Sequence, residues 1–506
     1  MSDVRGAAAG RLPQLKHLDG LRVVFCLAIQ IQHIKQWDTR SFLFSLETDQ
    51  GKDGPGRFEH ILHAASELGV SYFFVIGGYL AFYTAATKPT ASWGERKQYV
   101  WKRFARLMPT LWVSGIIYVV LTELFENAKA KPVCSSWRRP PGGRGCALST
   151  AGAGSFAWAV FLYAFALQDI SPIPQGISVN EPAWFVSAMC FCYIAYICIH
   201  KYLVERPWSA RTVALLLLLL LLVRSLPTLA YYLPCQLSFE DVIKPRHLSI
   251  IQPRPPFVLD RIFFWYEAFY HSPVIRFLEF LIGALVAKLG LHEDVKLFFT
   301  TNRRLAEIGS DLTFAVGALW MLFVYTGQDC QRRFKGSGDL FGHCLPLAFW
   351  MLISTHSKPE MDDCKYYGVI NKLLTCNVLV TLSPWSYGAY MYQLDVKVLT
   401  AKTGLLYEIA VDAKFSIIVF MWLLGGIMHT VLEAPAAAWL LKRGPSAQRP
   451  SLPVLSKDSS LVQENPGPLL PLEDEPLIQR KGQGTSNDSN EINSNETPHE
   501  DVRAPQ

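Results

Sequence analysis

An arginine and a histidine share one apolar segment near the start of the chain. Arg22 follows Leu18-Asp19-Gly20-Leu21, residues 23–31 are almost entirely apolar, and His33 comes soon after them. Eleven helical steps place Arg22 and His33 on nearly the same face, roughly 16 Å apart along the axis. Ionisable side chains at membrane depth are costly and indicate a functional site. The alternative is that Arg22 lies at the membrane interface and His33 ends the span.

Two further arginines have the spacing of an anion site. Arg103 and Arg106 are three residues apart and would share one helix face. Two guanidinium groups side by side suit the oxygens of phosphate groups. The alternative is that they anchor a span at its cytoplasmic end, where Lys and Arg accumulate.

Two glutamates belong to other apolar runs: Glu279 lies inside one, and Glu433 lies at the end of another. Arg276 and Glu279 have helical i, i+3 spacing, which favours a buried ion pair that fixes helix positions. Glu433 precedes Pro435, so its carboxylate either pairs with a site arginine or marks the end of a helix.

The composition indicates a helical membrane protein. Half of the 506 residues (50%) are hydrophobic and only 18% are charged. Apolar residues gather in blocks of roughly 18–22, the length that crosses a bilayer as a helix, whereas barrel strands alternate over shorter segments. We therefore predict an all-α, polytopic transmembrane bundle of about ten helices. No Cys/His spacing typical of metal sites and no basic arm is present, so we expect neither a metal nor a nucleic-acid partner.

The order of segments predicts three parts. Residues 1–17 are a short cytoplasmic segment, 18–443 the transmembrane domain, and 444–506 a polar tail that we expect to be disordered and cytoplasmic. Asp19 is the expected N-cap of the first span, and Gly77 and Gly78 permit close helix contact in the second. The predicted spans are residues 21–34, 68–86, 107–124, 184–199, 213–232, 275–289, 312–325, 341–354, 374–394 and 417–432, with a short, re-entrant or spanning piece at 156–167.

Charge and the tail suggest orientation and location. Basic residues between 88 and 106 form an expected cytoplasmic loop, which places the N-terminus in the cytoplasm. In the tail, Glu473-Asp474-Glu475-Pro476-Leu477-Ile478 has the pattern of an acidic dileucine signal that binds a sorting adaptor. It predicts a multi-pass protein of a eukaryotic endomembrane or the plasma membrane, with the endolysosomal system as one destination.

Five fragments, in this order and spacing, resemble the acyltransferase-3 family of membrane O-acyltransferases, which includes bacterial sugar O-acyltransferases and animal nose-resistant-to-fluoxetine proteins. The resemblance covers roughly residues 18–443. The fragments are Leu18-Asp19-Gly20-Leu21-Arg22 with His33; Gly69 to Leu80; Arg103-Phe104-Ala105-Arg106 with Pro109; Arg276-Phe277-Leu278-Glu279-Phe280 with Gly283; and Ser386-Tyr387-Gly388-Ala389-Tyr390 with Glu433 and Pro435.

The resemblance implies an acyltransferase for groups other than amino-acyl groups. Such an enzyme moves an acyl group, most often acetyl, from cytoplasmic acyl-CoA (the co-substrate) to a hydroxyl of a carbohydrate, lipid or other small acceptor. Arg103 and Arg106 would hold the CoA phosphates, Arg22 would orient the thioester, and His33 would be the general base or the acyl carrier. The supporting residues would be Asp19, Glu279, Glu433 and Tyr387.

The chain also departs from the family pattern. Met189 and Cys190 stand where acidic residues are usual, and Gln393 stands where many members have histidine. Ser71 and Gly77 replace an aspartate and a serine of the second span. These losses favour the alternative of a non-enzymatic lipid or small-molecule transporter derived from the same fold. A lysosomal acetyltransferase for amino sugars is a third hypothesis.

Overall fold

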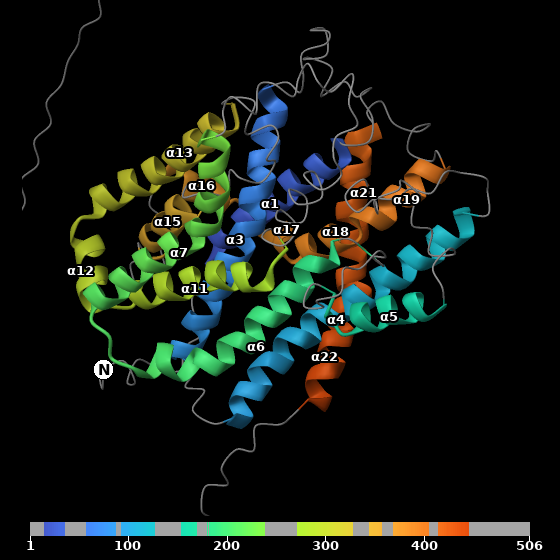
Figure 1. Cartoon of the computed structure of the whole chain (residues 1–506), viewed down its shortest axis with the longest axis horizontal. Helices are drawn as coiled ribbons and strands as arrows, with labels where there is room; N and C mark the ends of the chain where they lie inside the picture. Colours follow the sequence, from blue (N-terminus) through green and yellow to red (C-terminus); the bar gives the residue numbers. More distant parts are fainter. Residues whose placement is uncertain are drawn as a thin grey trace, which may run out of the picture. The chain divides into compact units, whose positions relative to one another are not determined.

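The computed structural model describes residues 15–35, 57–87, 93–126, 153–168, 180, 182–237, 271–326, 344–356, 368–403 and 413–444. In these residues the chain forms helices and no strand, which confirms the predicted all-α fold (Figure 1). They all belong to one compact unit, Met1–Gln448. The predicted tail, Gly444 apart, and its sorting motif lie outside the described residues.

The first helices begin earlier than the sequence indicates. Helix α1 spans Lys16–Lys35, so Asp19 lies in its first turn and is not the N-cap. Helix α3 spans Arg57–Thr87 and is followed by α4, Trp93–Glu126. The expected basic loop is therefore wrong from residue 93 onward, because Arg103 and Arg106 lie well inside α4. The short apolar piece forms α5, Ala153–Ala164.

The helices in the middle of the chain overlap the predicted spans, except α12, which was not predicted. Its helices are α6 (Ala183–Glu205), α7 (Ala210–Leu237), α11 (Pro273–Gly290), α12 (Glu293–Thr301), α13 (Arg303–Thr326) and α15 (Cys344–His356).

The predicted span at residues 374–394 is wrong as a single helix. It is divided among α16 (Val369–Leu374), α17 (Asn377–Leu382), η4 (Ser383–Trp385), α18 (Ser386–Met391) and the start of α19 (Gln393–Thr403). The opposite holds at the end of the chain. Helix α21 (Ala413–Met428) continues through a π-helical turn, η5 (His429–Glu433), into α22 (Ala434–Arg443). Glu433 therefore does not end a helix, since Pro435 occupies the first turn of α22, where a proline is tolerated.

Four stretches of the described helices are long and apolar enough to cross a membrane: Leu68–Ala86, Trp93–Leu121, Ala183–Glu205 and Phe415–Arg443. Helix α7 adds an apolar surface, because Leu215, Leu218 and Leu219 are 67%, 53% and 55% exposed. An outer face covered with leucine is expected where lipid replaces water. The findings support an integral membrane protein; the predicted count of about ten spans is not confirmed.

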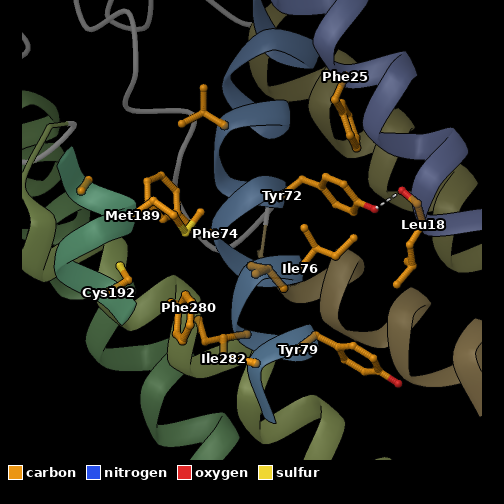
Figure 2. Packing of buried hydrophobic residues seen from close by; sticks show 14 of the residues in the cluster. Leu18, Phe25, Tyr72, Phe74, Ile76, Tyr79, Met189, Cys192, Phe280 and Ile282 are labelled. Carbon is orange, nitrogen blue, oxygen red and sulfur yellow. Dashed lines mark hydrogen bonds between the residues drawn. The ribbon is translucent and has the colours of Figure 1, made fainter. Parts of the chain in front are cut away.

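Glycines bring α3 and α11 into close contact at the centre of the bundle. A Cβ atom at Gly78 would overlap the carbonyl oxygen of Phe280, and one at Gly283 would overlap that of Val75. The close approach predicted for the glycine pair is thus confirmed for Gly78, and a Cβ atom at Gly77 would lie 3.3 Å from the Met189 side chain, closer than ordinary van der Waals contact. Figure 2 shows the apolar layer around this crossing, where the Tyr72 hydroxyl donates a 3.0 Å hydrogen bond to the Leu18 carbonyl and links α3 to α1.

A buried ionic network joins α3, α7 and α11. Arg276 Nη1 lies 2.8 Å from Glu279 Oε2, as the i, i+3 spacing predicts. Arg224 of α7 donates two bonds to Glu279 Oε1, at 2.9 and 2.6 Å, and Ser71 Oγ of α3 donates a third at 3.1 Å. The carboxylate is fully buried, so these donors replace the water it loses.

Candidate functional site

Arg22 is held near one end of α1 by its own helix. Its Nη1 atom lies 3.3 Å from Asp19 Oδ1, one turn earlier. Ser383 Oγ of η4 donates a 3.4 Å hydrogen bond to the same carboxylate oxygen. The Arg22 side chain keeps 29% of its surface exposed, so the ion pair orients the guanidinium without covering it.

The paired arginines of α4 adopt two different environments. The guanidinium of Arg103 lies over the rings of Tyr99 and Tyr193, with its carbon 5.3 and 5.6 Å from the ring centroids. These cation–π contacts fix a planar cation against α6. Arg106, one turn later, is exposed and interacts electrostatically with Arg103, Arg22 and Glu433. Cations from α1 and α4 thus lie close enough to create one positive region, which favours an anion.

Glu433 supplies the negative charge beside this region. It lies in the π-helical turn η5, a local irregularity that often marks functional sites. Its Oε2 atom is 3.3 Å from His429 Nδ1 on the same turn, and its side chain is 12% exposed. The predicted pairing of Glu433 with a site arginine therefore has an electrostatic partner in Arg106.

Tyr387 ties the divided helix region to α4. Its hydroxyl donates a 2.8 Å hydrogen bond to the carbonyl oxygen of Leu107, next to Arg106. The ring thus fixes α18 against the turn of α4 that carries the arginines.

His33 lies near the opposite end of α1 from Arg22, in contact with α19. Its Nδ1 atom is 3.0 Å from Oε1 of Gln393, and its side chain is half-buried. An amide oxygen accepts a hydrogen bond, so this arrangement puts the imidazole proton on Nδ1 and the lone pair on Nε2. A neutral imidazole with a lone pair on Nε2 is the form required of a general base.

The predicted residues therefore separate into three groups. Arg22, Arg103, Arg106 and Glu433 lie in one charged region, with Asp19 and Tyr387 in contact with it. His33 belongs to the other end of α1 with Gln393. Glu279 belongs to neither, because its hydrogen bonds go to the network of α3, α7 and α11.

The sequence reasoning missed several polar residues of these regions. Arg224 stands inside an apolar run, which is itself the signal of an intramembrane partner for a buried acid. The buried side chain of Gln30, on α1, accepts a 2.8 Å hydrogen bond from Trp422 Nε1 of α21. Asn180 and Asp395, both fully buried, carried no motif and were not identified.

Residues 15–432 match the family model of the acyltransferase domain Acyl_transf_3, and the chain belongs to this family. The match spans nearly all of the described helices. The resemblance carried by the five fragments is thus confirmed, and family membership together with the apolar helices supports a membrane acyltransferase. No curated protein and no solved structure matches the chain.

Proposed function

We propose that this protein transfers an acyl group, acetyl in the first instance, from cytoplasmic acyl-CoA to a hydroxyl group of an acceptor. The observation that carries the proposal is the division of α1 between a positively charged end at Arg22 and an imidazole end at His33. Eleven residues of helix separate them by about 16 Å, so an extended donor can span both ends. Family membership supplies the reaction class.

The arginine end suits the phosphates of CoA. Arg106 is exposed, Arg22 is partly exposed, and Arg103 is held rigidly between tyrosine rings. Guanidinium groups bind phosphate oxygens in pairs of hydrogen bonds, and a preformed positive region lowers the ordering cost of binding. The pantetheine arm would then run along α1 and bring the thioester toward His33.

The imidazole end suits removal of the acceptor proton. The acceptor oxygen attacks the thioester carbonyl carbon while Nε2 of His33 takes the hydroxyl proton. The tetrahedral intermediate then collapses, the carbon–sulfur bond breaks, and the imidazolium returns the proton to the departing CoA sulfur. The products are an ester and free CoA. Gln393 keeps the proton of the neutral ring on Nδ1 throughout the approach of the acceptor.

The first test needs no known acceptor, because water can replace it. The full chain in detergent is incubated with radiolabelled acetyl-CoA, and release of acetate and free CoA is measured. We expect His33→Ala to lower turnover by at least about 100-fold, the usual contribution of a general base. His292→Ala is the matched control, since His292 is the N-cap residue of α12 and belongs to neither proposed end of α1, and should stay within about twofold of the natural protein.

The outcomes separate the two functions considered. Equal turnover in the His33→Ala variant would rule out His33 as base and as acyl carrier. Absence of both turnover and acetyl-CoA binding in the natural protein would favour the transporter. Radiolabel retained on the natural protein, and absent from the variant, would indicate that the acyl group passes through the imidazole.

The donor site has its own prediction. The double variant Arg103→Gln, Arg106→Gln should raise the KM for acetyl-CoA by about tenfold or more, because two charge-assisted contacts to phosphate are lost. Lys102→Gln removes one exposed charge from the same helix turn and should change KM less than about twofold. An equal rise in both variants would mean that only the general positive charge of α4 matters.

A further inference from the structure

The break between α18 and α19 carries a group of buried polar side chains that the proposed mechanism does not use. Helix α18 ends at Met391, Tyr392 is its C-cap residue, and α19 begins at Gln393. Tyr392, Gln393 and Asp395 are 0%, 3% and 2% exposed. Gln393 is the residue of this group that contacts His33, and Tyr392 is its neighbour in the chain.

Asn180 fixes this break against α4. Its Nδ2 atom donates hydrogen bonds to Ser114 Oγ and to the carbonyl oxygen of Met391, both at 3.3 Å. Ser114 in turn lies 3.2 Å from the hydroxyl of Tyr163, which donates a 2.6 Å bond to the Leu111 carbonyl. Hydrogen bonds from Asn180, Ser114 and Tyr163 therefore hold the surroundings of the break, and Asn180 is fully buried there.

Several polar atoms around this break have no hydrogen-bond partner in the described part of the chain. They are Asn180 Oδ1, Tyr392 Oη, Gln393 Nε2 and both carboxylate oxygens of Asp395. Each buried polar atom without a partner costs free energy of folding, and an unpaired carboxylate costs most. Native proteins keep few such atoms, so several of them at one helix break indicate a place that is completed by a ligand.

The chemistry of these atoms selects a cation. Asp395 and Asn180 together offer three unused acceptor oxygens, which is the number of N–H donors on a primary ammonium group. Tyr163 and Tyr392 lie close enough to Asp395 to interact with it electrostatically. A neutral polyol would satisfy the hydrogen bonds but would leave the buried negative charge without an opposite charge.

We propose that Asp395, Asn180 and Tyr392 form the acceptor subsite and bind a primary ammonium group, so that the acceptor is an amino alcohol. Gln393, which contacts His33, lies two residues before Asp395 in α19, so the subsite and the imidazole are linked through the first turn of this helix. The assignment of the bound amine as acceptor rests on the proposed function. Binding of the amine itself does not depend on that function.

The binding test uses 2-aminoethanol and its uncharged counterpart, ethylene glycol, on the full chain without acetyl-CoA. Thermal unfolding is followed at equal ionic strength, because a ligand of the native state raises the unfolding temperature. We expect 2-aminoethanol to bind at least about tenfold more tightly than ethylene glycol. Asp395→Asn should remove this preference, and Tyr392→Phe should weaken it about two- to threefold.

Thr400→Val is the matched control, because Thr400 is a buried residue of α19 whose hydroxyl bonds only to its own helix. It should keep the preference for the amine. Equal binding of the two probes by the natural protein would overturn the subsite, and so would an unchanged preference in Asp395→Asn. Water would then be the partner of the buried polar atoms. If Asp395→Asn fails to fold, the comparison of the two probes on the natural protein still decides.

Acetyl-CoA turnover then separates the two proposals. With both correct, 2-aminoethanol accelerates CoA release more than ethylene glycol does. If the amine binds but acetyl-CoA is never consumed, the subsite stands and the acyltransferase proposal fails. If acetyl-CoA is consumed and neither probe binds, the acyltransferase stands and the amine subsite fails.

Discussion

Two buried carboxylates of this protein have opposite surroundings. Glu279 accepts hydrogen bonds from Arg224, Arg276 and Ser71, which come from three helices. Asp395 is as deeply buried, yet neither of its oxygens has a hydrogen-bond partner in the described residues. The same chemical group is therefore fully satisfied at one place and unsatisfied at another.

The difference separates a structural role from a binding role. A carboxylate with its donors already in place gains nothing from a ligand, and its removal leaves buried cations without an opposite charge. A carboxylate without donors destabilises the fold until something binds, which is the usual cost of a prepared site. The burial of a carboxylate does not distinguish a structural role from a binding role, whereas the number of its hydrogen-bond donors does.

The largest expected effect lies at the satisfied carboxylate. Glu279→Ala leaves Arg224 and Arg276 buried together, so we expect a loss of about 3–5 kcal/mol in the free energy of unfolding. Unfolding in detergent, followed by circular dichroism, measures it. Glu293→Ala is the control, because Glu293 pairs with Lys296 at 2.9 Å on the surface of α12 with 74% of its side chain exposed, and should change stability by less than about 0.5 kcal/mol. Equal small losses in both variants would contradict the structural role of Glu279.

Local patterns predicted the satisfied region well. Arg276 and Glu279 are one helical turn apart, and Gly78 lies in a glycine pair, so spacing along the chain was enough to indicate both the ion pair and the close helix contact. The third member, Arg224, is 55 residues from Glu279 in sequence. Only the packing of α7 against α11 brings them together, and spacing along one helix carries no such information.

The unsatisfied region was largely invisible in the sequence. The mostly apolar stretch at residues 374–394 predicted one span, although Asn377 and Pro384 interrupt it near points where the helix is divided. The break at Tyr392 is what places Asp395 in the interior. Gln393 was noted as a departure from the family, but its contact with His33 joins residues 360 positions apart. The roles of His33, Arg22, Arg103 and Arg106 stay predictions.

The smallest effect, and the sharpest contrast with Glu279, is expected at Asp395. Asp395→Leu replaces an unsatisfied carboxylate by an apolar side chain of similar size, so the protein without ligand should become more stable, by about 1 kcal/mol. The same unfolding measurement is used, and stabilisation by 2-aminoethanol should disappear in this variant. A loss of stability comparable with that of Glu279→Ala would mean that Asp395 has an essential partner within the fold, and the two carboxylates would then share a structural role.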